Sequence, residues 1–161
     1  MTGRHSSTPA LTTAGWREWV SLPEAGVPWI KAKLDTGARS SALHAFDIAE
    51  FEHEGQAWVR FSIHPWQRSL TDAVDVECRI LDKRKVRSSS GHATERYVVA
   101  LDIELCGRVV TSEVTLSRRD SMGFRMLIGR QALRHRFLVD PARSYLGGQP
   151  KRKTRKSNRG R

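Results

Sequence analysis

The sequence WIKAKLDTGA occupies residues 29–38. Every second residue of its first half is apolar, a pattern that predicts a half-buried β-strand. This strand would deliver Asp35 to its C-terminal end, and Gly37 would then allow a tight turn or a close backbone approach. A carboxylate at the end of a strand, followed by a small hydroxyl residue and a glycine, suits a catalytic group held in a turn. The alternative is an ordinary strand-to-turn junction without chemistry.

Further period-2 and short apolar segments predict more strands along the chain. They lie at residues 16–22, 42–52, 57–64, 74–86, 97–105, 108–116, 126–128 and 137–139. One short helix is predicted at residues 130–136. About eight strands with a single helix indicate an all-β domain, closed or sandwich-like.

The chain of 161 residues has the length of one domain. Residues 1–14 are rich in Ser and Thr and are expected to form a flexible leader, while residues 15–146 carry the predicted domain. The leader lacks the apolar core of a signal peptide, and no apolar run reaches the roughly 20 residues that span a bilayer. We therefore expect a cytoplasmic protein without a membrane partner. Cys78 and Cys106 are expected to be free thiols, with a bridge between neighbouring strands as the alternative.

The positive charge of the chain is unevenly distributed. The formal net charge is +11, and residues 151–161 carry many basic side chains and no acidic one. Such a run without aromatics or periodicity predicts a disordered tail, here residues 147–161. The tail could bind nucleic acid weakly and in a salt-sensitive way, or act only as a solvated segment that aids solubility.

Two further segments accompany the Asp35 turn. Residues 83–97 are expected to form a long hairpin, and its polar, glycine-containing tip at residues 88–93 suits a lid over a cleft. The apolar pair Leu127 and Ile128 is followed by Gly129 and leads directly into the predicted helix.

This order of Asp-Thr-Gly-Ala, flap hairpin and apolar-apolar-glycine strand resembles the retropepsin-like aspartic proteases. Residues 31–44 (KAKLDTGARSSALH), 61–67 and 115–133 (TLSRRDSMGFRMLIGRQAL) are similar to a bacterial family of small retropepsin-like proteins, often labelled ATP-dependent zinc proteases. The resemblance implies a closed, barrel-like acid-protease fold with one short C-terminal helix. It also implies an aspartic-type peptidase.

The zinc and ATP parts of that label lack their motifs. A zinc protease of the H-E-x-x-H type needs two histidines one helical turn apart. His53 and Glu54 begin such a motif, but its fifth position is Ala57. No G-x-x-x-x-G-K-[ST] loop is present for ATP phosphates. We therefore expect neither a metal nor another cofactor.

Aspartic protease chemistry needs two facing carboxylates that share a proton. The chain has a single Asp-Thr-Gly, so we expect a symmetric homodimer that contributes one Asp35 from each subunit. The resemblance implies that Thr36 locks the two active-site turns together and that Gly37 shapes the turn and contacts substrate. Ala38 stands where pepsin-like enzymes usually carry a hydroxyl residue, which favours activity nearer neutral pH.

Arginines crowd the segments that carry the resemblance. Arginine binds carboxylates through two parallel hydrogen bonds, so an acidic peptide is the expected substrate. The family is associated with ligases that add glutamates to a ribosomal protein, which implies glutamate tails as the target. The alternative is that most of these arginines form a solvated face or structural ion pairs. The candidates for substrate binding are Arg39, Arg87, Ser90, Gly91, Arg96, Arg125, Ile128, Gly129 and Arg130.

Two functions without catalysis compete with the peptidase. One is a binding module of retropepsin fold that docks RNA or a ribosomal partner through its basic tail. The other is a dimeric interaction protein without chemistry.

Overall fold

The computed structural model describes residues 10–66, 72–87, 91–118 and 123–157. The described residues are mostly β-strand, as the alternating sequence patterns predict. The strands are β1 (Thr12–Leu22), β2 (Val27–Asp35), β3 (Ser41–His44), β4 (Phe46–His53), β5 (Gln56–Ile63), β6 (Val74–Arg79), β7 (Asp82–Arg87), β8 (Ala93–Leu105), β9 (Arg108–Ser117), β10 (Met126–Gly129) and β11 (Phe137–Ser144). The helices are η1 (Pro23–Ala25), α1 (Arg130–Leu133) and α2 (Arg152–Ser157).

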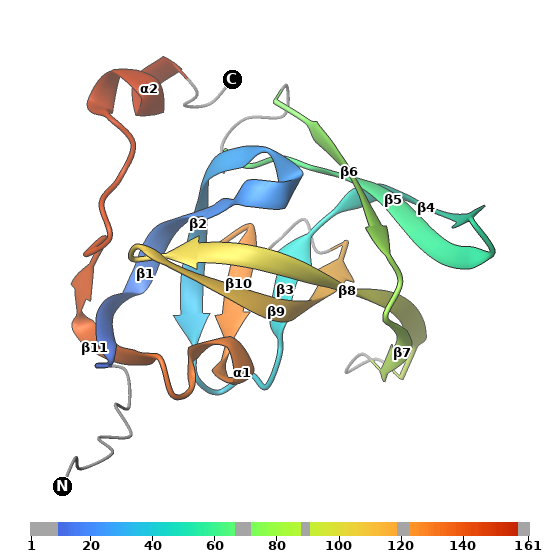
Figure 1. The fold of residues 1–161 in the computed structure, drawn as a ribbon, viewed down its shortest axis with the longest axis horizontal. Coiled ribbons are helices and arrows are strands. Elements are labelled where there is room, and N and C mark those ends of the chain that lie inside the picture. Colours follow the sequence, from blue (N-terminus) through green and yellow to red (C-terminus); the bar gives the residue numbers. More distant parts are fainter. Residues whose placement is uncertain (1–9, 67–71, 88–90, 119–122, 158–161) are drawn as a thin grey trace, which may run out of the picture.

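The larger sheet closes on itself. Its strand order is β11-β1-β2-β10-β3-β9-β8-β7, and β1 also pairs with β8, where Ser21 lies opposite Glu104 (Figure 1). This extra pairing turns six of the strands into a ring, so the prediction of a closed all-β fold is confirmed. The apolar residues at every second position of β2 are buried inside the ring together with side chains such as Leu43, Ile103 and Ile128.

A smaller antiparallel sheet of order β4-β5-β6 extends from the ring. The chain enters and leaves it at two points where we predicted unbroken strands. Residues 42–52 form β3 and β4, which separate at the buried Ala45, and residues 74–86 form β6 and β7. At the second junction the amide of Ile80 donates to Ala57, whereas the next amide, of Leu81, donates to Val98 in the other sheet. The predictions were wrong here because a change of pairing partner leaves the apolar alternation intact.

The ends of the domain also differ from expectation. β1 begins at Thr12, within the segment assigned to the leader, and α2 lies within the segment assigned to a disordered tail. β11 continues through Pro141, which an edge strand tolerates because one side of it needs no ladder hydrogen bonds. α1 ends before residue 134, because Arg134 has extended dihedrals and His135 has a φ of 70°. Among the described helices, none has the length and hydropathy of a membrane span.

Candidate active site

The topology brings the two predicted motifs together at one edge of the ring. β10 lies between β2 and β3, parallel to the first and antiparallel to the second. The register pairs Leu34 with Ile128 and Asp35 with Gly129. Because parallel strands end at the same edge, the carboxylate and the start of α1 become neighbours, as the lower edge of Figure 1 shows.

Asp35 is held in a short turn with part of its surface accessible. Its Oδ1 accepts a hydrogen bond from the Gly37 amide at 3.1 Å, and its carbonyl accepts one from the Ala38 amide at 3.2 Å. Within the described part of the chain, no hydrogen bond to Oδ2 is present, so this oxygen is open to water or substrate. Gly37 does not adopt a positive φ. An alanine there would crowd the carboxylate, because its Cβ would lie 3.3 Å from Asp35 Oδ1 and the side chain would have to shift by a few tenths of an ångström.

The loop that carries Asp35 is clamped by the first turn of α1. The Arg130 amide donates to the Ala38 carbonyl at 2.7 Å, and the Gln131 amide donates to the Arg39 carbonyl at 3.0 Å. The Arg130 guanidinium donates through Nη1 to the Thr36 carbonyl at 3.1 Å. Helix N-termini leave amides without partners inside the helix, and here loop carbonyls satisfy two of them. The turn is therefore fixed from several sides.

Two buried serines hold the Gly129 backbone in place through hydrogen bonds. The Gly129 amide donates to Ser41 Oγ at 3.1 Å, and Ser41 Oγ lies 2.9 Å from Ser112 Oγ. A Cβ on Gly129 would come within 2.4 Å of the Ser40 backbone, so no larger residue fits without movement. Neither serine could be predicted as part of the site, because their side chains meet across 71 residues and neither stands in a recognisable motif.

The predicted flap hairpin is present as β7 and β8, which pair from Asp82 opposite Val98 to Arg87 opposite Ala93. An ion pair with an Nζ–Oε1 distance of 2.6 Å joins Lys83 to Glu50 on β4. Their hydrogen bond raises the pKa of Lys83 and lowers the pKa of Glu50. This contact attaches the hairpin to the smaller sheet.

The candidate residues fall into two groups. The structure brings residues 35–39 together with Gly129 and Arg130. The Ile128 side chain is fully buried, so it supports the site from the core and is not available to substrate. The hairpin carries an exposed Gly91 with φ of 84° and places Arg96 opposite another arginine. Ser90 and the Arg87 side chain lie outside the described residues.

Arg125 lies away from Asp35, just before the start of β10, whereas Asp35 pairs with the last residue of that strand. The intervening four residues correspond to about 13 Å of strand. The Arg125 carbonyl accepts a hydrogen bond from the His44 amide at 2.8 Å. Arg125 therefore lies beside the apolar-apolar-glycine segment, as its position in the sequence predicts, but at the end of β10 that is away from Asp35.

No helix presents a pair of zinc-binding histidines at the partial motif. His53 ends β4 and Glu54 lies in the exposed turn before β5. Over the described ranges, no three His, Cys, Asp or Glu side chains are grouped so that they could hold a metal ion.

Comparisons with known proteins agree with this geometry. The family model described as "Retropepsin-like aspartic endopeptidase RimB" matches residues 13–150. Proteins named probable alpha-L-glutamate ligase from Shewanella halifaxensis and Desulfotalea psychrophila are 46% and 43% identical over 84% and 80% of the chain. The chain spans only 30% and 28% of the length of these two relatives. The crystal structure of Lpg0085, a Legionella pneumophila protein of unknown function, superposes with a TM-score of 0.71 at 30% identity, covering 86% of this chain and 99% of that one.

Proposed function

Because the chain belongs to the RimB-like family of retropepsin-like aspartic endopeptidases, we propose that it hydrolyses peptide bonds with Asp35 as its catalytic carboxylate. The observation that carries the proposal is the setting of this side chain. One oxygen is fixed by the Gly37 amide, the turn is clamped by α1, and the other oxygen is open. A carboxylate held in this way is pre-positioned for proton transfer.

The second carboxylate is proposed to come from another copy of the chain. The Asp-Thr-Gly turn occurs once in the sequence, so a two-fold axis next to it would bring two Asp35 side chains face to face. Two carboxylates at short range do not both ionise cheaply and share one proton. The ionised one accepts a proton from the attacking water, and the protonated one donates to the scissile carbonyl oxygen. Thr36 is exposed beside Asp35 and, in this proposed dimer, would form hydrogen bonds across the axis.

The proposed substrates are acidic, glutamate-rich peptides. Relatives that contain a similar segment within a longer chain are named alpha-L-glutamate ligases. A peptidase domain joined to such a ligase would meet peptides rich in glutamate. The basic residues next to Asp35 fit this chemistry, since Arg39 and Arg130 are exposed at the loop and at the start of α1.

The test compares wild-type protein with Asp35→Asn on oligoglutamate and on neutral peptides of equal length. Loss of general acid–base catalysis should lower the rate by at least about 10³-fold. Asp47→Asn is the matched control, because Asp47 is exposed with φ of 50°, a conformation that asparagine also tolerates. Equal hydrolysis by the two variants would eliminate Asp35 as the catalytic group.

Subunit mixing tests the shared dyad. If both carboxylates are needed, equal amounts of wild-type and Asp35→Asn subunits should leave about a quarter of the dimers active, since random pairing gives that share of wild-type pairs. Activity that falls only to half would mean that each subunit works alone. Polyanion binding without any hydrolysis would favour the binding module instead.

A further inference from the structure

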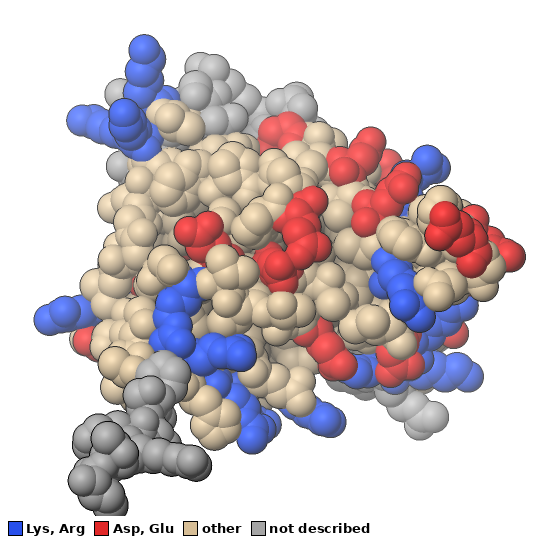
Figure 2. All heavy atoms as spheres, viewed as in Figure 1, with Lys and Arg blue, Asp and Glu red and all other residues tan. Residues whose placement is uncertain are grey.

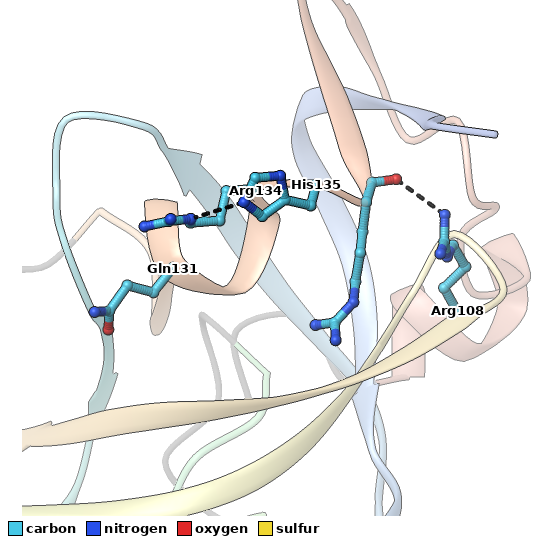
Figure 3. A pocket seen from close by; sticks show the side chains of 5 residues that line it. Arg108, Gln131, Arg134 and His135 are labelled. Atoms are coloured by element: carbon cyan, nitrogen blue, oxygen red, sulfur yellow. Dashed lines mark hydrogen bonds between the residues drawn. The ribbon is translucent and has the colours of Figure 1, made fainter. Parts of the chain in front are cut away.

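A pocket of about 510 Å³ lies at the far end of α1, away from the catalytic turn. Figure 3 shows Arg134 and His135 adjacent at the helix end, Gln131 on the preceding turn and Arg108 on the opposite wall. In the wider view of Figure 2, basic side chains gather along the lower edge near α1, whereas acidic ones lie over β8 and the β4–β6 sheet. The residues that line the pocket are Arg108, Gln131, Arg134, His135 and Arg136.

The lining carries positive charge without a carboxylate to balance it. Arg108 donates through Nη1 to the Ala10 carbonyl, the Thr12 hydroxyl and the Arg136 carbonyl, all of them neutral. Arg134 donates through Nε to His135 Nε2 at 3.3 Å. In the described parts of the chain, none of the lining residues forms an ion pair, and the lining contains no Asp or Glu.

Arginines elsewhere on the surface show the contrast. Arg84 contacts both Asp82 and Glu113, and Arg143 contacts Asp140. A concave site with several guanidinium groups and no counter-charge attracts anions. A bound anion reduces the repulsion between the guanidinium groups, and a carboxylate also matches the geometry of their hydrogen-bond donors.

The pocket is connected to the catalytic loop through one residue. Gln131 lines the pocket, and its amide holds the Arg39 carbonyl of the loop. Arg39 lies four positions after Asp35, so the backbone path between them is at most about 14 Å. An extended peptide rises about 3.3 Å per residue and would cover this distance with about four residues.

We propose that this pocket is a second binding site, which holds side-chain carboxylates of an acidic peptide substrate several residues away from the bond that is cut. The inference rests on the proposed peptidase function. It assigns acidic specificity to Arg134 and Arg136, which no sequence motif marks. Arg108 closes one wall and ties the start of β1 to the pocket.

The chemistry of the lining favours a peptide over single-stranded nucleic acid. Proteins that bind single strands usually place aromatic side chains where bases stack. The residues that line this pocket include no Trp, Tyr or Phe. Their amide, imidazole and guanidinium groups suit carboxylates, which require only hydrogen-bond donors and positive charge.

The experiment measures binding of a fluorescent peptide of about eight glutamates, long enough to reach from the turn to the pocket, to the full chain carrying Asp35→Asn. Arg134→Gln combined with Arg136→Gln removes two pocket charges but keeps the backbone contacts of both residues. The control pair, Arg60→Gln with Arg79→Gln, removes two exposed charges from the smaller sheet. We expect the pocket pair to weaken binding roughly tenfold, since two charge pairs of this kind together are worth about one decade in affinity. The control pair should change it less than twofold.

The same substitutions in the active protein separate this inference from the proposed function. The pocket pair should raise KM for the long acidic peptide roughly tenfold and leave kcat, and the cleavage of a peptide of about three residues, unchanged. If the pocket pair and the control pair hydrolyse the long peptide with equal KM, the second binding site is refuted and the proposed peptidase function stands. If the acidic peptide binds tightly, the pocket pair weakens this binding and no hydrolysis occurs, the proposed peptidase function is refuted and the second binding site stands. Binding of an RNA homopolymer that the pocket pair weakens, with no effect on oligoglutamate, would also overturn the pocket as a peptide site.

Discussion

Replacement of Gly129 by alanine tests the clamp between the Asp35 loop and α1. Gly129 has φ of −88° and ψ of 173°, which any residue adopts, so the change introduces no backbone strain of its own. Its new Cβ would lie 2.4 Å from the Ser40 carbonyl carbon and oxygen and 3.0 Å from the Ser40 Cα. Carbon atoms pack best at about 3.5–4.0 Å, so the backbone of the loop and that of β10 must separate by about 1 Å.

The expected cost follows from this displacement. Overpacking of a tight contact costs about 1–3 kcal/mol. The hydrogen bonds from Arg130 and Gln131 to the loop, at 2.7 and 3.0 Å, would stretch toward the limit of useful geometry. Their loss adds about 1 kcal/mol each. A total of about 3–5 kcal/mol lowers Tm by roughly 10 °C in a chain of this size.

Thermal unfolding followed by circular dichroism, at one fixed protein concentration, measures the shift, and hydrogen exchange at the Arg130 and Gln131 amides reports the clamp itself. Gly123→Ala is the control, because a Cβ there meets no atom of the described residues within 4 Å. We expect Gly123→Ala to leave Tm within about 2 °C. The reasoning is refuted if Gly129→Ala does the same and keeps both amides protected.

Two further predictions concern the buried Glu18 and the two half-buried cysteines. Glu18 is fully buried and accepts hydrogen bonds from the amides of Gly15, Leu146 and Gly147 at 2.6, 2.9 and 2.9 Å. Glu18→Gln places an amide donor against one of these donors and should cost about 2–4 kcal/mol in urea unfolding, whereas the exposed Glu52→Gln should cost nothing measurable. Burial raises the pKa of the Cys78 thiol to about 11 and that of Cys106 to about 12, with Glu24 and Glu18 adding to the respective shifts. Both thiols should therefore react with iodoacetamide at pH 8 at least about 100-fold more slowly than in urea, and rapid alkylation of the folded protein would contradict this. Because folding raises the pKa of both thiols, their contribution to the free energy of unfolding is fully present below about pH 9. It declines as the pH rises toward 11 and 12.

The local parts of this fold could be predicted from the sequence. The alternation before Asp35 gives β2, the glycine-containing turn gives the loop, and residues 83–97 give the hairpin arms, because each pattern depends on neighbours along the chain. The junctions at Ala45 and at Ile80 could not be predicted. There the strand changes its partner, and only the complete sheet determines which partner is available.

The candidate site was predictable for the same reason and to the same extent. Asp35 and Gly129 stand in short motifs, and their pairing follows from the parallel register of β2 and β10. The support from Ser41 and Ser112 depends on a contact over 71 residues, for which the sequence holds no signal. Arg125 shows a limit of the same kind, since it lies near the Gly129 motif in sequence, whereas the direction of β10 places it about 13 Å along the strand from the residue that pairs with Asp35.

The basic pocket could not be predicted, because what distinguishes its arginines is that no carboxylate lies beside them in the lining. Arg134 and Arg136 look in sequence like any exposed arginines, and only the fold shows that the pocket lining contains no carboxylate. The backbone and the side chains of α1 have different roles at this edge of the molecule. Its first amides are used to hold the Ala38 and Arg39 carbonyls, so its N-terminus has no free donors at these two positions for an anion. Positive charge for a substrate would then come from side chains, and we propose that the lining of the pocket supplies it where α1 ends.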